Sequence, residues 1–437
     1  MTKSKPRIAI FHCGFIYSGG GERIVLEEAK GLKKRGYRVE VFAPNIDPET
    51  CFPEFLKSLK VKTFLPQLPR WFPFRDGILM IVTSFLAPCF FYRFKKTDIF
   101  FGANQPGAWL AFCLSKLLGK PYLVYLNQPN RLVYPRKIDQ QTGWQTRRDY
   151  YLLAKIINYF KPLATLLDRL SFTKSQAMLV NGDYIGRIIQ KIYTKEVIMA
   201  SAGSYFQPLS KLRLNPTSAY RGQFSLNGIK IKKPYILITN RHEPQKRFDY
   251  VIKAFKLVLK KCPQAFLVIP GPFTLYTPKL IKLSKDLGIL PKIIFTNQVT
   301  ENQLQRLYQE AAVYCYPSPD EDFGLGPLEA GGWGVPTVAW KHGGPTVTVD
   351  DGVSGFLAEP YQIDDYAAKI TLLLKDKQLR AKMGKAAWMR TKTKFSWEKH
   401  LDILEREIRK ISNLNPSTPS ITLRINPLRT RIQKSKK

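Results

Sequence analysis

The sequence predicts an α/β protein with two doubly wound domains, each built on a parallel sheet. Short strand patterns alternate with helical patterns through both halves of the 437 residues, which is typical of β-α-β units. A polar stretch without clear periodicity separates the halves. The length suits two domains with sizeable cores. We therefore expect two sheets that face one another across a cleft, where ligands bind at the carboxyl ends of the strands.

The first half begins with a β-α-β unit. Residues 7–11 form an apolar strand pattern, and the glycine-rich loop HCGFIYSGGGER follows. Residues 22–35 carry apolar side chains at helical spacing, with Gly36 as the expected C-terminal cap. Residues 37–44 alternate like a strand. Further strands of the same sheet are expected within residues 98–104, 121–127 and 177–183.

The second half repeats this alternation. Strands are expected within residues 234–240, 264–272, 292–299 and 313–318. The predicted organisation is an N-terminal domain at 1–205, a connection at 206–230 and a C-terminal domain at 231–395. We expect a terminal amphipathic helix at 396–412 that packs back on the first domain, and a basic disordered tail at 413–437.

The formal net charge of +36 indicates an acidic partner. An anionic membrane surface, a phosphorylated substrate and nucleic acid all fit this charge, but no helix-turn-helix, zinc or RNA-binding aromatic signature is found. The six cysteines include no C-x-x-C pair and suit a reducing cytoplasm. The N-terminus shows no secretory pattern. The four histidines show no metal-ligand spacing.

Residues 77–96 have an apolar core of roughly 16 residues, which is shorter than the ~20 that a spanning helix needs. Pro88 interrupts the core, and basic and aromatic residues flank it. A surface helix lying on the membrane and a helix buried in the first domain both remain open. We therefore expect a cytoplasmic protein. If residues 77–96 form a surface helix, we also expect it to bind an anionic membrane peripherally.

The stretch DEDFGLGPLEAGGWGVP, residues 320–336, follows a predicted strand. Pro327 suits the first position of a helix and Gly334 its C-terminal stop, so we expect Glu321 in a loop and Glu329 in the first helical turn. The amides of Phe323, Gly324 and Leu325 would point at an anion.

The carboxylates beside these amides can only accept hydrogen bonds, so they suit the hydroxyls of a sugar or ribose. A sugar nucleotide, with hydroxyls at both ends and phosphates between them, has this shape. Asp320 and its neighbours also resemble a metal-binding cluster of acids, but we expect no metal cofactor, because Arg241 and Lys246 supply the positive charge.

Two further segments of the sequence also suit a sugar nucleotide. Arg241 and Lys246 follow a predicted strand in RHEPQK and could neutralise a departing diphosphate. Gly343 and Gly344 form a turn that offers backbone amides to phosphate or sugar.

Together these motifs resemble the retaining nucleotide-sugar glycosyltransferases of family four, which have the GT-B fold. The resemblance rests on the Glu-x7-Glu element, on RHEPQKRFD, on HGGPTVTVDDGVSGFL and on the opening loop, and it covers nearly the whole chain except the tail. It implies that Glu321 contacts donor-sugar hydroxyls, Glu329 holds the ribose, and Arg241 and Lys246 bind the pyrophosphate as catalytic groups. It also implies that the glycine-rich loop, with Gly19 and Gly20, approaches the donor phosphates. The reaction would retain the anomeric configuration by same-face attack.

The chain departs from that family at two positions. Many relatives carry a histidine in the acceptor-side segment that here reads YLNQPNR, so Asn127 stands in its place; Asn127 and Arg131 are expected to contact substrate. Asparagine can hydrogen-bond a hydroxyl but cannot shuttle a proton. Thr346 stands where a glutamate is frequent.

The expected activity is transfer of a hexose, first of all mannose from GDP-mannose, to a hydroxyl of a glycan or lipid-linked acceptor. A sugar-nucleotide epimerase or phosphorylase of the same fold, and a nucleic-acid-binding protein, remain as alternatives.

Overall fold

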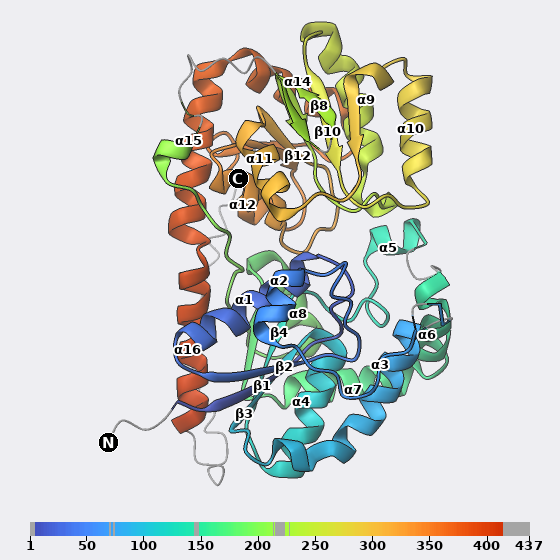
Figure 1. The fold of residues 1–437 in the computed structure, drawn as a ribbon, viewed down its shortest axis with the longest axis vertical. Helices are drawn as coiled ribbons and strands as arrows, with labels where there is room; N and C mark the ends of the chain where they lie inside the picture. Colours follow the sequence, from blue (N-terminus) through green and yellow to red (C-terminus); the bar gives the residue numbers. More distant parts are fainter. Residues whose placement is uncertain are drawn as a thin grey trace, which may run out of the picture.

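The computed structural model describes residues 5–69, 71–72, 75–143, 148–212, 214, 223–226 and 228–413. The chain forms two lobes stacked along the long axis of the molecule, each with a six-stranded parallel sheet between helices (Figure 1). The predicted fold class, two doubly wound α/β domains, is confirmed. The expectation for 413–437 falls outside the described residues, except that Asn413 ends the last helix.

The sheet of the N-terminal lobe has the strand order β2-β1-β3-β4-β5-β6, so the order reverses beside β1. All neighbours pair in parallel; Ile8 of β1, for example, lies opposite Val39 of β2 and Ile99 of β3. The strands are β1 (Arg7–Phe11), β2 (Arg38–Phe42), β3 (Ile99–Ala103), β4 (Tyr122–Leu126), β5 (Ala177–Val180) and β6 (Ile198–Met199).

The sheet of the C-terminal lobe has the order β11-β10-β9-β12-β13-β14 and reverses beside β9. Its strands are β9 (Tyr235–Leu237), β10 (Phe266–Pro270), β11 (Ile293–Thr296), β12 (Val313–Tyr316), β13 (Thr337–Trp340) and β14 (Gly355–Ala358). Strands β9 and β12 are buried throughout, as expected for parallel strands covered on both faces.

Helices cover both faces of each sheet. In the N-terminal lobe they are α1 (Gly20–Lys34), α2 (Pro53–Leu59), α3 (Arg75–Leu86), α4 (Asn104–Leu118), α5 (Lys137–Gln141), α6 (Arg148–Tyr159), α7 (Lys161–Thr173) and α8 (Asp183–Tyr193). In the C-terminal lobe they are α9 (Phe248–Lys261), α10 (Thr277–Asp286), α11 (Glu301–Glu310), α12 (Leu325–Gly332), α13 (Pro345–Thr348), α14 (Ile363–Lys375) and α15 (Lys377–Lys394). The last helix, α16 (Trp397–Asn413), returns to the N-terminal lobe.

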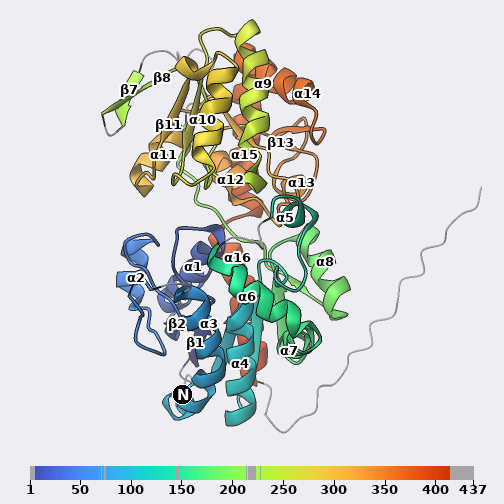
Figure 2. The ribbon, with the colours of Figure 1, turned by 90° about the vertical axis from the view of Figure 1, so that its right-hand side faces the viewer.

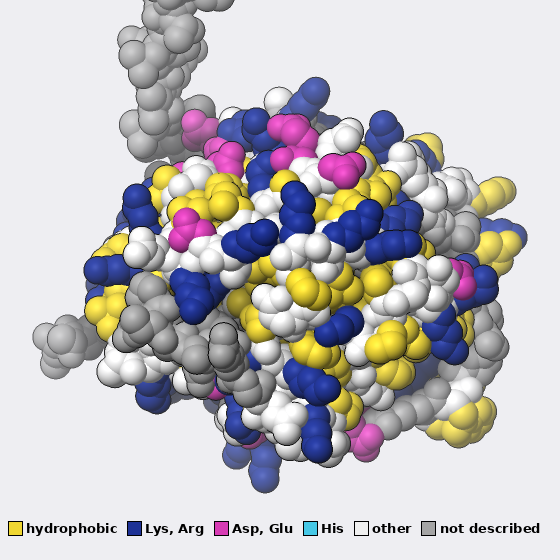
Figure 3. Space-filling model, turned by 90° about the horizontal axis from the view of Figure 1, so that it is seen from above, with side chains coloured by type: hydrophobic (Ala, Val, Ile, Leu, Met, Phe, Trp, Pro, Cys, Tyr) yellow, Lys and Arg dark blue, Asp and Glu magenta, His cyan; other side chains and the backbone are white. Residues whose placement is uncertain are grey.

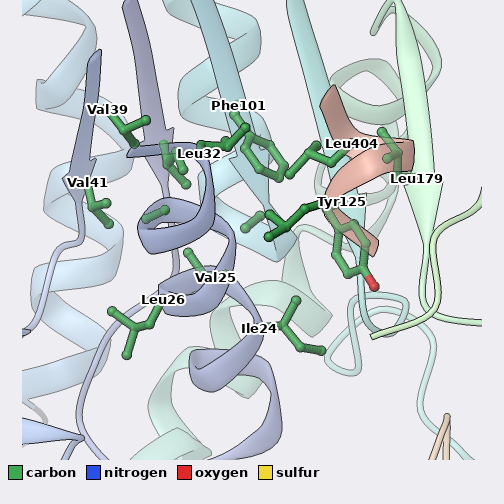
Figure 4. Close-up of a cluster of buried hydrophobic side chains, with 14 of the residues drawn as sticks. Ile24, Val25, Leu26, Leu32, Val39, Val41, Phe101, Tyr125, Leu179 and Leu404 are labelled. Carbon is green, nitrogen blue, oxygen red and sulfur yellow. The ribbon is translucent and has the colours of Figure 1, made fainter. Parts of the chain in front are cut away.

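The core of the N-terminal lobe includes side chains from α1, from the sheet and from α16 (Figure 4). Ile24 and Val25 of α1 and Leu404 of α16 are buried in it beside Phe101 of β3. A buried hydrogen bond between His400 Nε2 and Glu28 Oε1, 3.0 Å long, joins α16 to α1. The fold therefore brings to the same core two segments whose bonded residues, Glu28 and His400, are 372 positions apart in the sequence.

The chain passes between the lobes twice at neighbouring points. Ser204 donates its amide to the carbonyl of Phe395 over 2.8 Å, so the outgoing and the returning segments lie side by side. The sequence predicts an irregular connection at 206–230. The chain instead forms an antiparallel hairpin of β7 (Gln223–Leu226) and β8 (Ile229–Lys232) at the end of that stretch. Figure 2 shows this hairpin at the edge of the C-terminal lobe, and its Phe224 and Ile231 pack beside Tyr235.

The apolar segment expected at 77–96 forms α3 followed by a 3₁₀ segment, η1 (Ala87–Phe94). Among the described residues no single helix is long and apolar enough to cross a membrane; α3 and the segment from Pro88 to Phe94 pass that test only as a pair, bent by 69°. Leu79 and Thr83 face the core, whereas Phe85 is 70 % exposed. The segment is thus partly core and partly surface.

Basic side chains are spread over the surface. Figure 3 shows the end of the C-terminal lobe, where lysine and arginine side chains are scattered between apolar ones and acidic side chains gather along one edge. The positive charge is therefore not confined to the terminal tail.

Candidate active site

The candidate site residues follow the carboxyl ends of strands in both lobes. The glycine-rich loop follows β1, Asn127 follows β4, Arg241 comes after β9, and Glu321 comes after β12. The carboxyl ends of parallel strands share one edge of a sheet, and here the two edges face each other. The lobes touch at this level: a Cβ on Gly20 would lie 3.0 Å from Leu325 Cδ1.

Lys246 and Glu321 form an ion pair at this level, with 2.7 Å between Nζ and Oε2. Lys246 ends the 3₁₀ turn η4 (Pro244–Lys246), while Glu321 lies in the loop after β12, as predicted. Burial raises the pKa of Glu321, but the charges of Lys246 and Arg136 and the hydrogen bonds from Lys246 and Tyr316 outweigh burial and bring that pKa below its usual value. Glu321 is therefore a hydrogen-bond acceptor at neutral pH, which suits sugar hydroxyls.

Arg241 reaches toward the opposite lobe. Its guanidinium carbon lies 4.3 Å from the ring centroid of Tyr17, in the loop between β1 and α1. Its charge also acts on the neighbouring Glu22, where burial raises the pKa to about 7 and the charge of Arg241 opposes that rise. The arginine predicted to bind the diphosphate thus lies against the loop predicted to approach it.

The loop from Phe323 to Leu325 leads into α12. Gly324 has φ = 87°, a left-handed conformation that glycine adopts without strain, and it caps α12 at its N-terminus. Because α12 begins at Leu325 rather than at Pro327, Glu329 is the fifth residue of the helix, so the expectation of a first-turn position is wrong. Gly334 follows the helix with φ = 71°, as expected of a C-terminal stop.

Glu329 meets groups from both lobes. Tyr308 of α11 donates its hydroxyl to Oε2 over 2.9 Å, and Nη1 of Arg23 on α1 lies 3.9 Å from Oε1. Arg23 also pairs with Glu301 over 2.6 Å. The structure therefore adds Arg23 and Tyr308 to the predicted site.

Gly343 and Gly344 support the same loop. Gly343 has φ = 72°, and the amide of Gly344 donates to the carbonyl of Glu321 over 2.6 Å. A side chain on Gly344 would overlap the backbone of Phe323. Since the amide of Gly344 is already used, these two glycines shape the loop that carries Glu321.

Asn127 lies beside the start of α1: a Cβ on Gly21 would be 3.4 Å from its Nδ2. Both polar atoms of its side chain are buried and have no hydrogen-bond partner among the described residues. A buried amide in this state costs free energy until it meets a donor or acceptor. Asn127 thus offers an unpartnered donor and an unpartnered acceptor at the candidate site, at the position where the family resemblance leads one to expect a histidine in many relatives.

Arg131 is nearly fully buried, at 7 % exposure, and forms an ion pair with Asp322 of the opposite lobe. Arg136 also lies near Asp322, at 3.5 Å, and pairs with Asp139. Asp320 accepts from the amide of Ile138 over 3.2 Å. Arg131 therefore joins the two lobes at the level of the candidate site, and both aspartates that flank Glu321 already accept from protein donors.

Sequence reasoning missed several of these groups. Asp322 was visible as part of an acidic run, but its partner Arg136 lies in a segment without any motif. Arg23 and Glu22 follow the glycine loop directly and could have been found as charged residues at the N-terminus of a helix. Nothing in the sequence around Tyr308 indicates that it faces Glu329.

Two family models match the chain. The model described as "Glycosyltransferase Family 4" matches residues 18–194, and the model described as "Glycosyl transferases group 1" matches residues 223–389. The first match covers Gly19, Gly20 and Asn127, and the second covers Arg241, Lys246 and both glutamates.

Curated relatives align with nearly the whole chain or with part of it. The α-1,3/1,6-mannosyltransferase ALG2 of Dictyostelium discoideum is 24 % identical over 92 % of this chain and 98 % of its own length, and the human ALG2 is 23 % identical over 93 % and 96 %. A D-inositol 3-phosphate glycosyltransferase of Corynebacterium kroppenstedtii is 32 % identical over 42 % of this chain and 43 % of its own length.

Solved structures agree in fold. HepE of Anabaena, in complex with UDP and glucose, has a TM-score of 0.66 at 16 % identity and covers 93 % of this chain and 100 % of its own. Sucrose-phosphate synthase of Thermosynechococcus elongatus has a TM-score of 0.68 at 19 % identity and covers 93 % and 99 %. Both share the arrangement of two facing α/β lobes.

Proposed function

We propose, from the premise that this chain belongs to the retaining nucleotide-sugar glycosyltransferases of family four, that it transfers mannose from GDP-mannose to a hydroxyl of a glycan or lipid-linked acceptor. That it is a glycosyltransferase with the GT-B fold follows from the family; the donor and the acceptor are the proposal. Because the chain belongs to this family, we favour sugar transfer over the three alternatives, which were an epimerase, a phosphorylase and a nucleic-acid-binding protein.

The choice of mannose is supported by similarity to ALG2 proteins along nearly the whole chain. Glucose is the competing sugar, because HepE, with the same fold, binds UDP and glucose. Transfer to a hydroxyl is supported by Asn127, whose unpartnered amide can hydrogen-bond a hydroxyl of the acceptor substrate or of the donor sugar.

The observation that carries the proposal is the ion pair of Lys246 with Glu321 after the neighbouring strands β9 and β12, together with Arg241, which lies against Tyr17 of the opposite lobe. In the proposed complex, Lys246 and Arg241 bind the diphosphate, Glu321 accepts hydrogen bonds from sugar hydroxyls, and Glu329 accepts them from the ribose. The ammonium of Lys246 has three donors, so it can hold Glu321 and still donate to a phosphate oxygen.

In the proposed reaction the bond between the sugar C1 and the phosphate oxygen breaks while the acceptor oxygen bonds to C1 from the same face. Negative charge gathers on the leaving oxygen, where pre-placed cations stabilise it. Asn127 cannot take the acceptor proton. The departing phosphate oxygen, which lies on the same face, takes that proton instead.

The experiment is a thermal-shift and turnover screen of the folded chain against GDP-mannose, UDP-glucose and ADP-glucose. A ligand that binds only the folded state raises the unfolding midpoint. We expect the largest rise with GDP-mannose, and the rise should shrink in Lys246→Ala but not in Lys285→Ala, which changes an exposed lysine of α10. A larger rise with UDP-glucose would refute the proposed donor but not the assigned cleft. Equal rises of the unfolding midpoint in Lys246→Ala and Lys285→Ala would refute the assignment of the donor-binding cleft around Lys246.

We also propose peripheral binding to an anionic membrane, which would bring the enzyme to a lipid-linked acceptor. Support comes from α3, α6 and α7 and the segment after α3, which expose several large apolar side chains: Phe85, Leu86, Tyr92, Tyr159, Phe160, Leu163 and Leu166. Helix α6 contacts both α3 and α7. Basic residues lie among them, including Arg93, Lys95, Lys155 and Lys161. This combination is typical of surfaces that lie on a membrane.

A further inference from the structure

Three potential metal ligands meet at the start of the glycine-rich loop. His12 and Cys13 directly follow β1, and Glu22 is in the first turn of α1. One ligand atom from each residue lies within 4.8 Å of the other two. His12 and Glu22 are buried, and Cys13 is partly buried. The sequence shows no metal spacing here, because Glu22 lies ten positions after His12 and only the fold brings the two together.

The distances suit a tetrahedral ion. Cys13 Sγ lies 3.5 Å from His12 Nε2, and Glu22 Oε1 lies 4.0 Å from the same nitrogen. A tetrahedral zinc ion with the usual Zn–S and Zn–N lengths of about 2.3 and 2.0–2.1 Å separates its sulfur and nitrogen ligands by about 3.5 Å. The carboxylate oxygen needs to approach the nitrogen by about 0.6 Å to reach the corresponding separation of about 3.4 Å.

The orientation of His12 also fits. Its Nδ1 lies 3.3 Å from the carbonyl oxygen of Ala103, at the end of β3, so Nδ1 carries the proton and donates to that oxygen. The lone pair is then on Nε2, which faces Cys13 and Glu22. Metal-binding histidines usually hydrogen-bond a carbonyl or carboxylate in this way, which fixes the ring and its tautomer.

The charges of the three side chains would balance the ion. A thiolate at Cys13 and a carboxylate at Glu22 supply two negative charges, while His12 binds in its neutral form. With the ion bound, the cluster would carry no net charge. It would therefore not repel the positive charge of Arg241, which acts on Glu22. Thiolate, imidazole and carboxylate together favour a borderline-soft ion over Mg²⁺ or Ca²⁺.

We propose that His12, Cys13 and Glu22 form a binding site for Zn²⁺ or a similar divalent transition-metal ion. The ion joins the end of β1 to the start of α1 and so fixes both ends of the loop that contains Tyr17 and Gly19. The proposal does not rest on the donor or acceptor assignment. The ion is also not the group that meets the diphosphate charge, because that role belongs to Lys246 and Arg241.

The test is titration of the metal-free chain with Co²⁺ and Zn²⁺. Cobalt bound to a thiolate gives a charge-transfer absorption that free cobalt lacks, so one equivalent of Co²⁺ should produce this band and Zn²⁺ should displace it. Zn²⁺ should also raise the unfolding midpoint. Cys13→Ser should abolish the band and the shift, whereas Cys89→Ser, which removes an exposed thiol elsewhere, should leave both unchanged.

Glu22→Gln provides a second variant that keeps the thiol and the shape of the site, and it should weaken cobalt binding at least tenfold. Circular dichroism shows whether each variant is folded. Absence of the cobalt band in the wild-type chain would overturn the proposal, as would an undiminished band in folded Cys13→Ser. A band lost only in Cys89→Ser would identify the exposed thiol as the ligand and equally overturn it.

Discussion

Lys246 and Glu321 form an ion pair in the structure, which holds both side chains at the proposed donor site. We predict that Lys246→Ala lowers kcat on the order of 10²-fold, because a preorganised charge on the leaving diphosphate is lost. Arg241→Lys should not reach the wild-type rate, since the ammonium of lysine cannot reproduce the planar guanidinium that lies over Tyr17. The measurement is steady-state release of nucleoside diphosphate at saturating donor.

Lys285→Ala is the control for this prediction, and its rate should equal that of the wild type. Substitutions of surface residues away from a site usually change stability by within about 0.5 kcal/mol. A folded Lys246→Ala enzyme that turns over at the wild-type rate would place Lys246 outside the site and weaken the roles assigned to its neighbours.

The same cations lead to a prediction about metal removal. We expect turnover to persist in EDTA, because in the proposed complex Lys246 and Arg241 meet the charge on the leaving group. The ion proposed at His12 supports a loop and takes no part in that step. Complete loss of turnover in EDTA, with recovery on addition of Mn²⁺, would contradict this expectation and return the acids around Glu321 to consideration as metal ligands.

Asp168 provides a pH-dependent test in the N-terminal lobe. Burial raises its pKa from 3.8 to about 6, although Tyr193 and Gln105 donate hydrogen bonds to it. Between these two values the folded chain binds more protons at this group than the unfolded chain does. The contribution of Asp168 to the free energy of unfolding therefore falls as the pH rises from about 4 to 6, by up to about 3 kcal/mol, and stays constant above pH 6.

We predict that Asp168→Asn removes this decline. Chemical denaturation of both proteins between pH 4 and 7 measures it, and Asp364→Asn, which changes an exposed acid of α14, should behave like the wild type. Parallel curves for the wild type and Asp168→Asn would show that the carboxyl is not perturbed in the folded chain.

Residue types and spacing predicted Glu321 and Lys246 as site residues, and the structure brings these two side chains together. They could be predicted because each follows a strand in a short, recognisable segment. The pairing of Arg131 with Asp322 could not, since it depends on how two separately folded lobes meet. The buried, unpartnered amide of Asn127 likewise depends on the position of α1.

At the scale of elements, the central strands were predicted well because buried parallel strands are short, continuous apolar runs. The residues of β1 agree with the prediction at both ends. The β7–β8 hairpin was missed because three of four side chains in β8 are exposed, which leaves little apolar pattern to detect. The sequence predicted that α12 starts at Pro327, but the helix starts at Leu325. Proline is tolerated at several positions of the first turn, so it does not mark the first helical residue.

Helix α16 leads to a prediction about stability. Leu404 is fully buried in the core of the N-terminal lobe, so Leu404→Ala should lower the free energy of unfolding by about 2–5 kcal/mol through lost burial and the cavity that remains. Leu372→Ala, on the exposed face of α14, is the matched control and should have a much smaller effect. Equal effects in chemical denaturation would show that α16 does not pack as described.

At the scale of the whole molecule, the net charge of +36 and the exposed apolar side chains of α3, α6 and α7 should act together. We predict that the chain floats with phosphatidylglycerol liposomes at low salt and less with neutral phosphatidylcholine, since each Lys or Arg near the surface contributes about 1 kcal/mol. Tyr159→Ser should weaken the binding, whereas Leu372→Ser, on the other lobe, should not. Absence of flotation at low salt would contradict the membrane proposal and favour a water-soluble acceptor.

The return of α16 to the N-terminal lobe also sets the order in which the chain can mature during synthesis. Domains usually fold as they emerge from the ribosome, the N-terminal one first. Here the core of the first lobe includes Leu401, Leu404 and Ile408, which are made after the entire second lobe. The first lobe must therefore wait, with part of its apolar surface uncovered, until α16 has been synthesised, whereas the second lobe can complete its own core earlier.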